Sequence, residues 1–105
     1  MTYKFDKARY ITRGIQADIP AELQLIMWFM IDENIKNMLK LDYLQVFKLM
    51  PFHKDGNTYQ KIIHSQEVPN RTKEKVLNVL EKAITAKIFA IDDIQHITML
   101  LASEY

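Results

Sequence analysis

The chain has 105 residues, of which 49% are hydrophobic and 26% charged, so we expect one folded domain, residues 1–105, rather than disorder. Its net charge of +1, from 14 basic and 13 acidic residues, gives no support to nucleic-acid binding, which a strongly basic domain would favour. The absence of cysteine excludes disulfides and cysteine-ligated zinc, and with no visible signal peptide it fits a cytoplasmic protein.

The first predicted element is a strand at Arg9–Ile15, which is rich in β-forming residues and contains Gly14 near its end. An even number of positions separates Arg9 from Arg13, so both side chains would project from one face of this strand. Two arginines placed in this way could contact a phosphate or a carboxylate. An exposed strand face without a ligand is the alternative that we favour.

A long helix within Pro20–Leu41 is the central predicted element. Asp18 is a candidate cap before Pro20, which is tolerated in a first helical turn. At about 100° per residue, six apolar side chains gather on the side that would face the core. They are Leu23, Ile26, Met27, Met30, Ile31 and Met38. The unbroken apolar run, Leu25–Ile31, is too short to span a bilayer, so no membrane contact is expected.

A second apolar patch lies on the opposite side of this helix and consists of Leu25, Trp28 and Phe29. Aromatic side chains are enriched in the buried centres of protein interfaces. The sequence therefore predicts self-association or a protein partner at this patch, with Trp28 near the axis of a two-fold dimer. The alternative is that another part of the same chain covers the patch.

A hairpin is predicted from Asp42–Met50 and Thr58–Gln66, because Asp55-Gly56 is a strong turn signal between two strand-like runs. Alternation places Tyr43, Gln45, Phe47 and Leu49 on one face of its first strand, with Leu44, Val46, Lys48 and Met50 on the other.

A second, shorter helix is predicted at Arg71–Ala83, followed by strands at Thr85–Ile91 and His96–Ser103. Both strands are apolar at odd and at even positions, which is typical of strands buried on two sides. The predicted order is β-α-β-β-α-β-β. The predicted fold class is α+β, with a mostly antiparallel sheet of about five strands, one long helix and one shorter helix.

No residues in the sequence form a recognisable catalytic, metal or cofactor site. His64 and Ser65 are adjacent in a predicted strand and would point to opposite faces, so they cannot act as a base and a nucleophile together. His53, His64 and His96 lack the spacing of metal ligands, and we expect them to be solvated or hydrogen-bonded. Asp92-Asp93 is most simply a turn sequence. With two glycines in the chain, a glycine-rich phosphate loop is excluded.

Six stretches of the sequence resemble a known family. They are Arg9–Gly14, Ile19–Gln24 with Met27-Trp28, Asp42–Phe47, His64–Glu67 with Pro69, Thr85–Phe89 with Ile91–Asp93, and Thr98–Tyr105. On these motifs the chain resembles the small domain-of-unknown-function family of staphylococci and other low-GC Gram-positive bacteria. The resemblance covers nearly the whole chain. It implies a bacterial source and a soluble cytoplasmic protein, and it assigns no residue to catalysis, a cofactor or a ligand.

The leading hypothesis is therefore a small interaction or regulatory protein that is not an enzyme, binds no cofactor, and associates with itself or with another protein. The alternative is a nucleic-acid-associated accessory protein from a mobile element, which would use a sheet face or Arg9 and Arg13.

Overall fold

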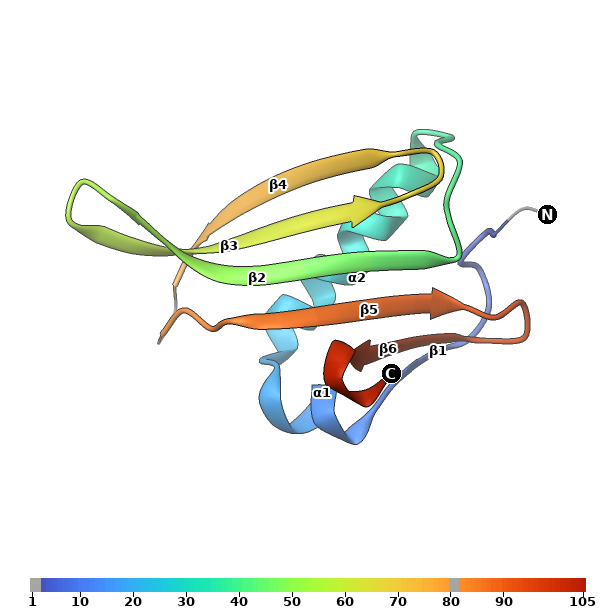
Figure 1. Cartoon of the computed structure of the whole chain (residues 1–105), viewed down its shortest axis with the longest axis horizontal. Helices are drawn as coiled ribbons and strands as arrows, with labels where there is room; N and C mark the ends of the chain where they lie inside the picture. Colours follow the sequence, from blue (N-terminus) through green and yellow to red (C-terminus); the bar gives the residue numbers. More distant parts are fainter. Residues whose placement is uncertain (1–2, 80–81) are drawn as a thin grey trace.

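The computed structural model describes residues 3–79 and 82–105, and in these residues six strands form one sheet with two helices (Figure 1). The strands are β1 (Arg9–Ile11), β2 (Leu44–Lys54), β3 (Asn57–Gln66), β4 (Arg71–Asn78), β5 (Ala86–Asp92) and β6 (Ile97–Leu101). The helices are α1 (Arg13–Asp18) and α2 (Ala21–Lys36), and a short 3-10 helix, η1 (Ala102–Glu104), precedes the C-terminal residue.

The strand order is β1-β6-β5-β2-β3-β4, and all neighbouring strands are antiparallel except β1 and β6. The predicted class, an α+β fold with a mostly antiparallel sheet, one long helix and one shorter helix, is confirmed.

The β2–β3 hairpin has the predicted turn. Asp55 and Gly56 both adopt positive φ angles, 51° and 80°, as a tight two-residue hairpin turn requires. Lys54 pairs with Asn57, and the pairing continues without interruption to Val46 and Ser65. The turn therefore sets the register that determines which side chains share each face of the sheet.

The predicted helix at Arg71–Ala83 is wrong over Arg71–Asn78, which forms strand β4. β4 pairs with β3 along its whole length, from Gln66 opposite Arg71 to Tyr59 opposite Asn78. Residues 80 and 81, which the predicted helix includes, lie outside the described residues. The polar residues on both faces of β4 fit an edge strand, and pairing with a distant segment overrides the local helical pattern.

The shorter helix is α1, and the predicted strand Arg9–Ile15 is wrong from Arg13 onward, where the chain is helical. The strand ends at Ile11, and the Thr12 hydroxyl caps α1 by accepting a hydrogen bond from the Ile15 N–H at 3.3 Å. The Thr12 hydroxyl also donates to the Glu104 carboxylate at 2.6 Å, and this bond is the main cause that lowers the pKa of Glu104. A Cβ atom on Gly14 would lie 2.7 Å from the same carboxylate, so a larger residue at this position would displace the Glu104 side chain from α1.

α2 crosses behind the sheet in the view of Figure 1 and buries Met27, Met30, Ile31 and Asn34. The predicted Asp18 cap is wrong, because Asp18 is the last residue of α1 and α2 starts after Pro20 with no side-chain cap. Of the six residues predicted to face the core, Leu23 and Ile26 pack against it only in part. Met38 is 91% exposed, because α2 ends at Lys36 and Met38 turns away with a φ of 59°.

α2 covers only one face of the sheet, which we call the inner face. Apolar and polar side chains from four strands are buried there: Gln45, Phe47, Leu49, Gln60, Ile62, His64, Gln66, Ile88, Ala90, Asp92, Ile97 and Met99. On the opposite face of the predicted two-sided strands β5 and β6, the C-terminal segment is the only described part of the chain that lies against part of β5, where Tyr105 contacts Phe89 (Figure 1). The opposite side, the open face, is turned toward the viewer in Figure 1.

Candidate functional site

The open face carries an apolar patch at the centre of the sheet. Leu44 is paired with Ile91, and Val46 with Phe89, so these four side chains form two adjacent rows across β2 and β5. Leu100 extends the second row onto β6, opposite Phe89. All five are half-buried, and the ring of Tyr105 meets Phe89 edge-on at 5.5 Å while remaining 72% exposed. A contiguous apolar patch on the surface is a candidate interaction site.

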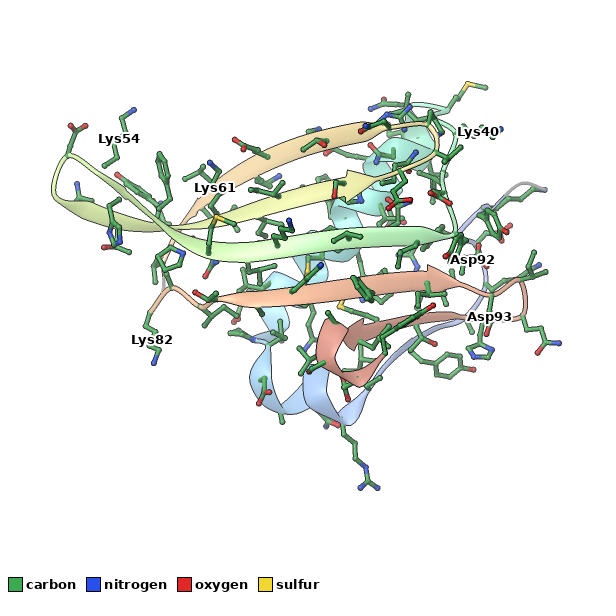
Figure 2. The ribbon with its side chains drawn as sticks, viewed as in Figure 1. Lys40, Lys54, Lys61, Lys82, Asp92 and Asp93 are labelled. Atoms are coloured by element: carbon green, nitrogen blue, oxygen red, sulfur yellow. The ribbon has the colours of Figure 1, made fainter. Side chains whose placement is uncertain are left out.

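Opposite charges flank this patch at its two ends. Lys48 and Lys87 are paired directly across β2 and β5, one row beyond Val46 and Phe89. Asp42 and Asp93 lie one row beyond Leu44 and Ile91 in the other direction; Figure 2 shows Asp93 just past the end of β5. Two like charges placed opposite each other destabilise a sheet, so the lysine pair gains from acidic groups that approach the open face.

The predicted interface residues on α2 do not form one continuous exposed patch. Leu25 is 68% and Phe29 52% exposed, whereas Trp28 packs against the core. The Arg9 guanidinium lies over the Trp28 ring, 5.0 Å from its centroid. Self-association through this patch stays a prediction, with two exposed side chains rather than three.

The predicted arrangement of Arg9 and Arg13 on one strand face is wrong, because Arg13 is the first residue of α1. Arg9 projects from β1 toward α2, where it forms an ion pair with Asp32 that includes an Nη1 to Oδ2 contact of 3.1 Å. An anion contact by these two residues is untested, and the ion pair with Asp32 makes Arg9 less available for it.

A chain of hydrogen-bonded amides on the inner face fixes the tautomer of the neutral His64 ring. The Gln66 amide nitrogen donates to the carbonyl oxygens of Lys40 and Pro69, at 3.0 and 2.9 Å, so its oxygen is left to accept from the Gln45 amide at 2.9 Å. The Gln45 oxygen then faces His64 Nε2 at 2.6 Å. His64 must donate through Nε2, which leaves Nδ1 unprotonated in the neutral ring.

Sequence reasoning did not predict this network, although two signals for it were present. Gln45 shares the apolar face of β2 with Phe47, and His64 and Gln66 share one face of β3. The prediction that His64 and Ser65 point to opposite faces is confirmed, since His64 is 4% exposed on the inner face.

Burial and the nearby cations lower the pKa of His64. Desolvation is the largest cause, followed by the charges of Lys73 and Arg71, and together they bring the pKa from 6.5 to about 4. Because the folded pKa lies below the unfolded one, the unfolded chain binds more protons between these values. The stabilisation is complete above pH 6.5 and is lost as the pH falls toward 4.

We expect acidification across this range to cost the fold about 3 kcal/mol through His64. The variant His64→Gln should therefore show a shallower loss of unfolding free energy than wild type when urea unfolding is measured at about pH 7 and about pH 4.5. The exposed His53→Gln is the matched control and should keep the wild-type pH dependence. Equal slopes for wild type and His64→Gln would contradict the buried neutral state.

The remaining histidines and the predicted turn have ordinary surroundings. His96 Nε2 lies 3.2 Å from the Asp93 carboxylate, and His53 Nδ1 lies 3.0 Å from the Thr58 hydroxyl. The turn role of Asp92-Asp93 is confirmed: the Asp92 carboxylate accepts from the Ile94 N–H, and that of Asp93 accepts from the N–H groups of Gln95 and His96. Among residues 3–79 and 82–105, no three metal-ligating side chains come together.

A protein-family model described as "Staphylococcal protein of unknown function (DUF960)" matches residues 8–104. The chain belongs to this family. The predicted family resemblance is thereby confirmed. A crystal structure of a protein of unknown function from Enterococcus faecalis is similar to this DUF960 member, with 30% sequence identity and a TM-score of 0.79 over 100% of this chain and 98% of that chain. A search of curated proteins finds no match.

These descriptions name no activity for this DUF960 protein or for its structural neighbour. Within the part of the chain that the structure describes, no helix is long and apolar enough to cross a membrane.

Proposed function

We propose that this protein is a non-catalytic interaction protein of the cytoplasm whose working form is a two-fold dimer, with the open faces of two copies packed together. One observation carries the proposal: the sheet is apolar on both faces, and α2 covers only the inner one. Two sheets packed face to face, about 10 Å apart and nearly aligned, are a common way to bury such faces.

The open face is self-complementary about one particular axis. The axis lies between the two packed sheets, parallel to both of them and perpendicular to the strands, at the level between the two apolar rows. A two-fold rotation about it places Val46 over the partner's Leu44 and Phe89 over the partner's Ile91. The same rotation exchanges the two charged ends, so that Lys48 and Lys87 of each copy face the acidic end of the other. An isologous contact requires a patch that matches itself in this way. Apolar groups then meet apolar groups, and the lysine pair gains acidic neighbours.

The predicted nucleic-acid alternative has weaker support. Three lysines lie on the open face, but Lys61 is 3.4 Å from the Glu74 carboxylate, and the whole chain carries a net charge of only +1. Binding to a polyanion needs a basic surface without acidic groups among its cations. Asp42 and Asp93 would repel a phosphate backbone laid across the same face.

The dimer is tested by molar mass in solution. At tens of micromolar we expect sedimentation equilibrium to give wild type a molar mass twice the 12.4 kDa of one chain. Val46→Asp places a charge at the apolar centre and should weaken the dimer by about 100-fold or more, while the far-UV dichroism stays unchanged because Val46 is not in the core.

The matched control is Leu25→Asp, which introduces the same charge on the exposed side of α2 and should leave the dimer intact. Wild-type protein that is monomeric at this concentration would contradict the proposal. A dimer that Leu25→Asp dissociates and Val46→Asp does not would move the interface to α2.

A further inference from the structure

A second site lies away from the open face, in a hollow of about 200 Å³ between the C-terminal end of α2 and the strands β3 and β4. Asn34 and Asn37 line it from the helix side, His64 from β3, and Arg71 and Lys73 from β4. Gln45 and Gln66 also line it, so the hollow brings two cations, four amides and an imidazole together, and it is large enough for a small ligand.

Asn34 is the most informative residue of this hollow. It is 7% exposed, yet no hydrogen bond joins its side-chain amide to another described residue. In the described residues, no fully buried side-chain polar atom lacks a partner, so the Asn34 amide must reach the space of the hollow. An amide that lines a hollow and has no protein partner can donate a hydrogen bond to a ligand bound there.

The charge around the hollow is positive. Lys73 is paired directly opposite His64 across β3 and β4, and Arg71 is paired opposite Gln66, two positions along the same face. Both charges contribute to the lowered pKa of His64, after desolvation. Arg71 uses one nitrogen, Nη1, to donate to the Lys40 carbonyl at 3.3 Å and keeps its other donors. Lys73 is 3.6 Å from the Glu33 carboxylate, which is the acidic group that α2 directs to this side. β2 contributes Gln45 and Phe47 next to His64, and neither of them titrates.

The carbonyl groups at the end of α2 would repel an anion if they were free, but they are already used. The carbonyls of Glu33, Asn34 and Ile35 accept from the N–H groups of residues 37, 39 and 38 at 2.9–3.0 Å. The negative end of the helix is therefore largely satisfied by its own chain, and the donors of the side chains dominate the hollow.

We propose that this hollow binds a small oxyanion, with Arg71 supplying the main charge, Lys73 shared between the anion and Glu33, and the Asn34 amide supplying a further donor. The ligand class is a compact dianion such as phosphate, sulfate or a short dicarboxylate. The guanidinium fork of Arg71 matches two oxygens of such a group, and Lys73 can approach a third. This site is independent of the dimer, because none of the open-face residues at the proposed two-fold axis lines it.

Binding should couple to the protonation of His64. A bound dianion offsets the two cations that now disfavour a charged imidazole, so it raises the His64 pKa. With Nε2–H donated to Gln45, the added proton goes to Nδ1. The affinity for an anion of constant charge should therefore rise as the pH falls. By linkage, binding of that anion should make protonation of His64 easier by the same factor.

The test titrates the full chain with sulfate, whose charge does not change in this pH range, at constant ionic strength held with chloride. Amide and imidazole NMR signals report binding at Asn34 and His64. We expect Arg71→Gln to lower the association constant about tenfold or more, since a charge-assisted hydrogen bond is lost. The control Arg13→Gln, on the exposed surface of α1, should bind like wild type. Circular dichroism checks that each variant is folded. If Arg71→Gln does not fold, Lys73→Gln takes its place in the titration.

Two further titrations vary the pH and the anion. Sulfate should bind more tightly at about pH 5.5 than at about pH 7.5, and His64→Gln should abolish that difference. Phosphate and succinate, titrated in parallel, decide between a phosphate-type and a dicarboxylate ligand. The absence of shifts at Asn34 and His64 in millimolar sulfate would overturn the proposal, and so would equal weakening by Arg71→Gln and Arg13→Gln.

Discussion

Replacing Gln66 with leucine should lower the free energy of unfolding by about 3 kcal/mol or more, as much as a large cavity in the core would. The Gln66 amide satisfies four groups: the carbonyls of Lys40 and Pro69, the Asp42 N–H, and the Gln45 amide. Leucine fills a similar volume but leaves these groups without their partner, and each buried group left unpaired costs about 1–3 kcal/mol.

Urea unfolding of Gln66→Leu compared with Gln16→Leu measures this effect. Gln16 is exposed on α1, so its substitution should change stability by no more than about 0.5 kcal/mol. A loss below about 1 kcal/mol for Gln66→Leu would show that water replaces the amide easily, and that the network does not hold the segment before β2 against β3.

The second large effect is expected at Phe47, which has no exposed surface and stacks on His64 with the ring centroids 4.3 Å apart. Phe47→Ala should cost about 3–5 kcal/mol, because it leaves a cavity between α2 and the centre of the sheet. Phe52→Ala, near the hairpin turn, is the control and should cost much less, since Phe52 is only half-buried. Similar losses for the two variants would contradict the assignment of Phe47 to the inner face.

The hairpin and the two faces of β2 are predictable from the sequence because their signals are local. Asp55-Gly56 specifies the turn, and alternation from Gln45 to Leu49 separates an inner from an outer set of side chains. The same reasoning fails at Arg71–Asn78. There the polar residues on both faces give no strand alternation, and the helical spacing of Val76, Leu77 and Leu80 gives a competing signal. Only pairing with β3 decides the outcome, and that pairing is not local.

The candidate sites are predictable to different degrees. Apolar residues at odd and even positions of β5 predict that both faces of this strand are buried. In the structure α2 covers only the inner face, so the sequence pattern already indicates that a further element or a second copy covers the open face. The amide network and the hollow beside it are not predictable in this way. Gln45, Gln66 and Asn34 come together only after the hairpin, β4 and α2 have packed, and the orientation of each amide depends on backbone groups far away in the sequence.

Distances between two spin labels in the dimer test the proposed interface most directly, and the absence of native cysteine allows a single label for each variant. In the proposed dimer, position 48 of one copy lies over position 42 of the other. A label at Lys48→Cys should therefore give a distance of about 20–25 Å between copies, from six residues along the strands and one sheet spacing across them. A label at Leu25→Cys, on the outer side of α2, should give more than about 30 Å, because two sheets and two helices separate the labels. The reverse pattern, short at position 25 and long at position 48, would contradict the sheet-to-sheet dimer and place the interface on α2.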